Sequence, residues 1–92
     1  MNIPQPVSLE TAIRIYYEKF ELRKKDVDEL FGVMSKTQAY LMFNKAREVM
    51  AKHNITTIDS RAVNTECAYE AWGFNIEDLE NRYNKLRRIF KR

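Results

Sequence analysis

The chain has only two glycines and two prolines in its 92 residues, and their positions limit what it can fold into. Pro4 and Pro6 lie within the first six residues, while Gly32 and Gly73 stand far apart. A sandwich or barrel of many short strands needs turn residues at regular spacing, which this sequence lacks. The sequence therefore predicts an all-α fold, a small helical bundle of four to five helices.

Apolar residues that recur three and four positions apart mark the expected helices. Ser8 and Ser35 are good N-caps, and Gly32 and Gly73 can take the positive φ that ends a helix. Residues 54–63 show no helical period and predict a connector with a short extended piece. The segments that show the helical period are 9–21, 24–31, 36–53, 65–72 and 76–90.

Each of these segments has an apolar stripe that we expect to face the core. In the first segment the stripe comprises Leu9, Ala12, Ile13, Tyr16, Tyr17 and Phe20. In the third it comprises Ala39, Met42 or Phe43, Ala46, Val49 and Met50. We expect one domain, residues 1–92, with a tri-helical core at 8–53 and a C-terminal helical extension at 64–90.

The composition argues against secretion, membrane insertion and catalysis. The single cysteine, Cys67, has no partner for an internal disulfide, and the N-terminus lacks the layout of a signal peptide. No apolar run approaches the roughly 18 residues of a membrane span. We therefore expect a cytoplasmic protein with no membrane partner. One histidine, His53, and one cysteine cannot build a structural zinc site, so we expect neither an enzyme nor a bound metal or cofactor.

Positive charge gathers in two places along the chain. The net charge is only +3, but the six charged side chains from residue 82 onward are all basic. A second group of cations lies on the segment 36–53. Such clusters suit a polyanion, and chance clustering on a solvated surface is the alternative.

The middle of the chain has the pattern of a helix-turn-helix. A short helix ends at Gly32, which permits a sharp turn. Val33 is expected to fill the space between the two helices, and the small Ala39 is expected to let them approach closely. Ser35 caps the second helix and leaves its N-terminus free to meet a phosphate or a DNA groove.

The run GVMSKTQAYLMFNKAREVM resembles the helix-turn-helix of small DNA-binding proteins from bacteriophages and mobile elements, of the excisionase-like and small-terminase-like kinds. Three positions depart from that pattern. Met34 makes the turn one residue longer than the commonest form, Leu41 stands where such helices often carry Arg or Lys, and Asp28 stands where the first helix usually has Ala. The resemblance implies DNA contacts from one face of the second helix. The contact positions that it implies are Ser35, Lys36, Thr37, Gln38, Tyr40, Asn44 and Lys45.

The residue types suggest two kinds of contact with double-stranded DNA. Gln38 and Asn44 can pair with adenine in the major groove. Cations fix the register on phosphates without reading sequence. The expected cations are Lys36, Lys45 and Arg47 on this helix and Arg23, Lys24 and Lys25 at the start of the preceding one. We predict a phage or mobile-element regulator that inserts its recognition helix, at about 36–53, into the major groove.

Two other functions fit the same residues. A helical protein–protein adaptor without DNA binding would use Tyr40, Leu41, Trp72 and Phe74 as exposed apolar contacts. An aromatic pair such as Trp72 and Phe74 is, however, also typical of a core anchor. A DNA-packaging or assembly component would bind DNA weakly within a ring.

The last segment carries an apolar seam with a heptad repeat. The seam predicts either a homodimer that matches a two-fold DNA site or packing on the first helix, which would complete the core. The sequence leaves both open. The residues of the seam are Ile76, Leu79, Tyr83, Leu86 and Phe90.

Overall fold

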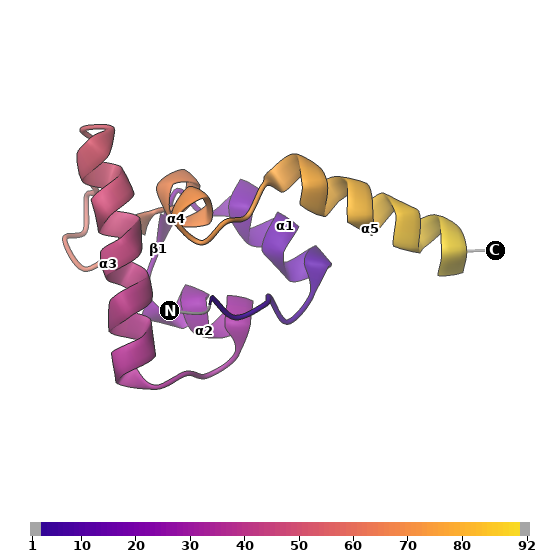
Figure 1. Cartoon of the computed structure of the whole chain (residues 1–92), viewed down its shortest axis with the longest axis horizontal. Helices are drawn as coiled ribbons and strands as arrows, with labels where there is room; N and C mark the ends of the chain where they lie inside the picture. Colours follow the sequence, from indigo (N-terminus) through magenta and orange to yellow (C-terminus); the bar gives the residue numbers. More distant parts are fainter. Residues whose placement is uncertain (1–2, 91–92) are drawn as a thin grey trace.

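A computed structural model describes residues 3–90 of the chain. Over this range the chain forms five α-helices and one small antiparallel sheet of two strands (Figure 1). The predicted small, mostly α-helical bundle is confirmed. The elements in chain order are α1 (Leu9–Glu18), β1 (Glu21–Leu22), α2 (Lys24–Phe31), α3 (Lys36–Lys52), β2 (Val63–Asn64), α4 (Thr65–Ala71) and α5 (Ile76–Phe90).

The helices begin where side chains cap their free backbone N–H groups. Ser8 Oγ accepts a hydrogen bond from the N–H of Thr11 at 3.0 Å, and Ser35 Oγ accepts one from Gln38 at 3.1 Å. The side chains of Asn64 and Asn75 cap α4 and α5 in the same way. Such caps satisfy donors that have no partner within the helix.

The first helix is shorter than predicted, and part of its expected inner face was wrong. The helix ends at Glu18 rather than near residue 21, since Glu21 and Leu22 pair as β1 with β2. Because the chain has left the helix, Phe20 is 91% exposed and Leu22 is fully buried. Within α1 itself Ile15 is fully buried and Tyr17 is 65% exposed, so Tyr17 does not belong to the inner face of the helix.

α4 joins the first and third helices. The Tyr69 hydroxyl, on a side chain that is almost fully buried, donates to the carbonyl oxygen of Ala12 in α1 at 2.6 Å. The Trp72 indole N–H donates to the carbonyl oxygen of Met42 in α3 at 3.0 Å. Both side chains also fill apolar space, so α4 holds α1 and α3 at a fixed separation.

The molecule is elongated, 45 × 27 × 22 Å, with α3 at one end and α5 reaching toward the other (Figure 1). The first half of α5 packs on α1, which is one of the two arrangements that the sequence predicted for the seam. Leu79 is buried and Ile76 lies against the core, so these two cannot serve the predicted homodimer. Leu86 is 43% exposed. The Phe90 side chain lies outside the part that the structure describes.

No helix within residues 3–90 is long and apolar enough to cross a lipid bilayer.

Candidate nucleic-acid interface

The turn before α3 differs from its predicted arrangement in one respect. Gly32 takes φ +86°, a backbone conformation that a residue with a Cβ rarely adopts, as its place at the end of α2 required. Val33 does not fill the space between the helices, since it is 91% exposed. Met34 lies against the core instead. The extra residue in the turn shifts which side chain points inward, and this shift explains why the expectation for Val33 was wrong.

The main neighbours of α3 are α4 and β2 rather than α2. Ala39 is buried, as predicted, but the close approach to α2 expected there is not the principal contact of α3. Aromatic rings occupy the region beyond the end of α2. The Phe31 ring meets the Trp72 ring at 5.4 Å and the Phe74 ring at 5.7 Å between centroids. Trp72 is therefore a buried core residue, and Phe74 is half-buried against the core, so neither is the fully exposed contact expected for an adaptor.

The face of α3 turned away from the core carries most of the predicted contact positions. Lys36, Thr37 and Lys45 are exposed, and Tyr40 is 64% exposed. The two predicted readers of adenine, Gln38 and Asn44, are half-buried. The face is not uniformly polar or basic. Leu41 and Glu48 are also exposed on it.

Some of these side chains already have partners within the protein. Ser35 Oγ caps α3, and Asn44 Oδ1 accepts a long hydrogen bond of 3.5 Å from Arg47. The Arg47 guanidinium lies 5.6 Å from the centroid of the Phe43 ring, a cation–π arrangement. This packing holds the Arg47 charge along one edge of α3.

An open groove lies beside that edge of α3, and we call it the basic groove. Four of its lining side chains are cationic, and they come from the start of α2 and from the connector after α3. The lining residues are Arg23, Lys24, Lys25, Phe43, Asp59 and Arg61. Its lining has one carboxylate against four cations, and Arg47 lies at the Phe43 wall, so the groove carries more positive than negative side chains.

Asp59 organises the two arginines of the groove. Its carboxylate accepts a hydrogen bond from the Arg23 guanidinium at 3.0 Å and one from the backbone N–H of Arg61 at 2.9 Å. These bonds, that of the Arg61 backbone first, hold the pKa of Asp59 below its ordinary value. Asp59 therefore stays ionised and keeps Arg23 and Arg61 close together.

The lysines of the groove differ in their pairing. Lys24 forms an ion pair with Asp28, one turn along α2, at 2.6 Å between Nζ and Oδ1. Lys25 is exposed on the same short helix. An exposed ion pair such as Lys24 with Asp28 contributes little, so Lys24 can exchange its partner for a phosphate at small cost.

The predicted contact residues of α3 fall on two edges. At 100° per residue, Lys36, Tyr40 and Arg47 share the edge that carries Phe43 and faces the basic groove. Gln38 and Lys45 lie on the opposite edge by the same geometry. The groove thus gathers Arg23, Lys24 and Lys25 with only part of the predicted recognition surface.

The sequence prediction missed Arg61. This residue lies in the connector between α3 and β2, a segment with no helical period that could assign it to a face. Its side chain is 90% exposed. Only the pairing of β2 with β1, which brings the connector back beside α2, places Arg61 in the groove.

Two other reactive side chains, Cys67 and His53, lie near Glu70. Burial, and then the nearby Glu70 and Glu66, raise the pKa of the Cys67 thiol, so the reactive thiolate is disfavoured. The Glu70 carboxylate lies 3.5 Å from His53 Nε2. No cluster of three or more His, Cys, Asp or Glu suited to a metal ion occurs among residues 3–90.

No protein-family model, curated protein or solved structure matches this chain.

Proposed function

We propose that this chain binds double-stranded DNA with α3 and the basic groove beside it. The observation that carries the proposal is the convergence of cations from separate segments on one groove: Arg23, Lys24 and Lys25 before and within α2, and Arg61 in the connector. Charged side chains that only interact with water have no reason to gather in one groove. The phosphates of a duplex carry negative charges at short intervals, so several cations gathered in one groove can contact several phosphates.

In this proposal the basic groove and α3 have different tasks. The groove cations and Arg47 hold phosphates and set the register of the protein on the duplex. The outer face of α3, with the exposed Thr37 and Tyr40 and the half-buried Asn44, meets base edges in the major groove. Gln38 and Lys45 approach from the far edge of the helix, so they contact the duplex only if α3 enters the groove deeply.

The role in a cell is a further step of the same proposal. The resemblance of the helix-turn-helix run to proteins of bacteriophages and mobile elements supports a regulator of that kind. The basic groove itself supports DNA binding without specifying the process.

The experiment is a titration of labelled random duplex DNA with the full chain at several salt concentrations. We expect binding at 50 mM salt that weakens steeply as salt rises, because each phosphate contact releases a counterion. The double variant Lys25→Ala with Arg61→Ala removes two groove cations. It should lower the magnitude of the slope of log affinity against log salt by about 2.

The matched control is the double variant Lys85→Ala with Arg88→Ala. It removes the same charge from α5, which reaches toward the end of the molecule opposite to α3 (Figure 1). If both double variants lower the slope of log affinity against log salt equally, the DNA is attracted by the net charge of the chain and not by the groove. Undetectable binding of the unaltered chain at 50 mM salt would contradict the proposal.

A protein–protein adaptor is the second candidate, and one observation favours it. Tyr40 and Leu41 are adjacent exposed apolar side chains on the outer face of α3, 64% and 43% exposed. Of the other two residues expected for this function, Trp72 is buried in the core and Phe74 is half-buried against it. If the chain binds no DNA, Tyr40 and Leu41 are the residues to substitute in a search for a partner protein.

A further inference from the structure

The basic groove contains one carboxylate, Asp59, at the place where its two arginines meet. Asp59 Oδ2 accepts a hydrogen bond from Nε of Arg23 at 3.0 Å, and Asp59 Oδ1 accepts a long one from Nε of Arg61 at 3.5 Å. Only 19% of the Asp59 side chain is exposed. An acid at a site for a polyanion repels its ligand, so its presence there calls for another task.

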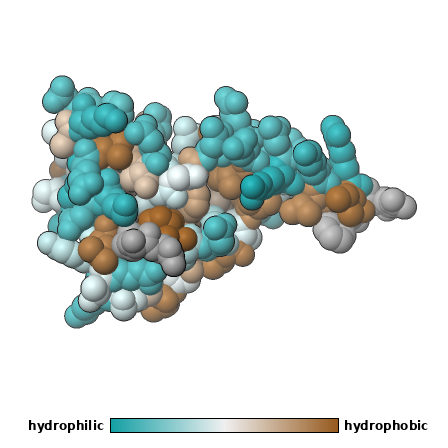
Figure 2. Space-filling model, in the orientation of Figure 1, coloured by the Kyte–Doolittle hydropathy of each residue, from teal (hydrophilic) through white to brown (hydrophobic). Residues whose placement is uncertain are grey.

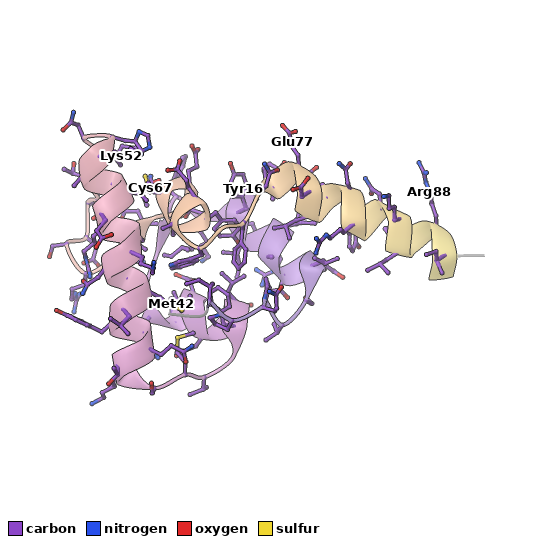
Figure 3. The ribbon with its side chains drawn as sticks, viewed as in Figure 1. Tyr16, Met42, Lys52, Cys67, Glu77 and Arg88 are labelled. Atoms are coloured by element: carbon purple, nitrogen blue, oxygen red, sulfur yellow. The ribbon has the colours of Figure 1, made fainter. Side chains whose placement is uncertain are left out.

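The backbone around Asp59 is fixed by hydrogen bonds from outside the groove. Glu21 in β1 accepts the backbone N–H of Ile58 at 2.7 Å and, through its other oxygen, that of Asp59 at 3.4 Å. Thr57 Oγ1 donates to the carbonyl oxygen of Asp59 at 2.8 Å. Figure 3 shows the connector after Lys52 turning back beside α3, on the side away from α5. The carboxylate is therefore held at one place beside the start of α2.

Both arginines contact Asp59 through Nε, which leaves their other donors for a ligand. Within residues 3–90, the hydrogen bonds of these two guanidinium groups are made by Nε alone. The Nη groups carry most of the N–H donors of a guanidinium, and arginine uses such donors in pairs to bind a phosphate. Both side chains are more than half exposed. The surface over α3 is mainly hydrophilic, with some hydrophobic spots (Figure 2), so a charged ligand can approach this end of the molecule.

We propose that Arg23 and Arg61 together bind one phosphate of the duplex and that Asp59 is the positioning residue that holds them for it, an inference that rests on the proposed DNA binding. A flexible arginine loses side-chain entropy when a ligand fixes it, and this loss weakens binding. Asp59 reduces that loss, because it holds both guanidinium groups before the DNA arrives. Its repulsion of the phosphate is the smaller effect, since two guanidinium groups surround its single charge.

The other carboxylate beside a groove cation has a different arrangement. Asp28 pairs with Lys24 one turn away on the same short helix, at 2.6 Å between Oδ1 and Nζ. Among residues 3–90 its side chain contacts no second cation of the groove. Removing the Asp28 charge therefore releases Lys24 and removes a repulsion, without separating two phosphate-binding groups. Asp28 is the matched control for Asp59.

The first test compares Asp59→Asn with Asp28→Asn in the titration of duplex DNA at one low salt concentration. Both substitutions raise the net charge by one. The asparagine at 59 keeps an oxygen for the backbone N–H of Arg61, but its amide nitrogen replaces the oxygen that holds Arg23. We expect Asp59→Asn to lower the affinity about threefold, because Arg23 is then ordered only on binding. Asp28→Asn should raise the affinity about twofold, because one repulsive charge is lost.

The second test measures whether Asp59 acts through Arg23. In a chain that already carries Arg23→Ala, Asp59→Asn has no guanidinium to release, so it should raise the affinity about twofold by removing a negative charge. A purely structural role would lower the affinity in both backgrounds, and that result would overturn the proposal. Circular dichroism of each variant should match that of the unaltered chain.

The unaltered chain and the single variants separate two kinds of failure. If the unaltered chain binds no DNA, the proposed function fails and the positioning role of Asp59 fails with it. If the unaltered chain binds DNA and Asp59→Asn raises the affinity as much as Asp28→Asn does, only the positioning role is refuted. A loss of affinity in Asp59→Asn that turns into a gain beside Arg23→Ala is the result that supports it.

Discussion

Replacing Tyr69 by Phe tests the bond that joins α4 to α1. The hydroxyl donates to the carbonyl oxygen of Ala12 at 2.6 Å from a side chain that is 1% exposed. The Ala12 carbonyl also accepts the helical bond from the N–H four residues on, so the substitution leaves no unpaired acceptor. The cost is then that of one hydrogen bond, about 1 kcal/mol of unfolding free energy. For a domain of this size, that is a fall of roughly 5 °C in Tm.

The same bond predicts a dependence on pH. Burial raises the pKa of Tyr69 above its ordinary value. Above about pH 10 the unfolded chain therefore releases a phenol proton that the folded chain keeps, and the wild type loses stability as the pH rises. Tyr69→Phe has no such proton. At about pH 11 the wild type has lost roughly 1.4 kcal/mol of unfolding free energy through this ionisation. That loss is at least as large as the hydrogen-bond contribution, so the wild type should no longer be more stable than Tyr69→Phe at that pH.

The assay is urea unfolding of both chains between pH 7 and 11, followed by circular dichroism. Tyr40→Phe serves as the control, because Tyr40 is 64% exposed and its substitution should leave stability within about 0.5 kcal/mol. Equal stability of wild type and Tyr69→Phe at pH 7 would refute the hydrogen bond. A gap that stays constant up to pH 11 would refute the link between burial and ionisation.

Two further outcomes follow from the structure. Val33→Ser should change the free energy of unfolding by less than about 0.5 kcal/mol, because Val33 is exposed, whereas Met34→Ser should lower it by more than about 1 kcal/mol, because Met34 lies against the core. Urea unfolding measures both values, and the reverse order would contradict the inward position of Met34 in the turn. Gln38 and Lys45 lie on the far edge of α3, so their effects in selection from a random DNA pool report how deeply the helix enters the major groove. On deep entry Gln38→Ala should relax preference at one base pair while Lys45→Ala weakens all sequences alike, and equal effects on every sequence would remove Gln38 as a reader.

The sequence by itself determined the helices and their caps. The bounds of α2 and α5 agree with the prediction, and Ser8 and Ser35 cap the helices that they were expected to cap. These features depend on residues within one or two turns of each other, so a local pattern contains the information. Burial of Ala39 followed from the same local period.

Only the tertiary structure decided where α1 ends, which side chain fills the turn before α3 and how far the α5 seam is used. The pairing of β1 with β2 joins residues about forty positions apart, and it ends α1 early and exposes Phe20. The same pairing brings Arg61 beside Arg23 to form the basic groove. Local periodicity cannot predict such a contact, because the free energy that favours it comes from segments distant in the sequence. The candidate interface was therefore predictable as a helix, but its groove required the fold.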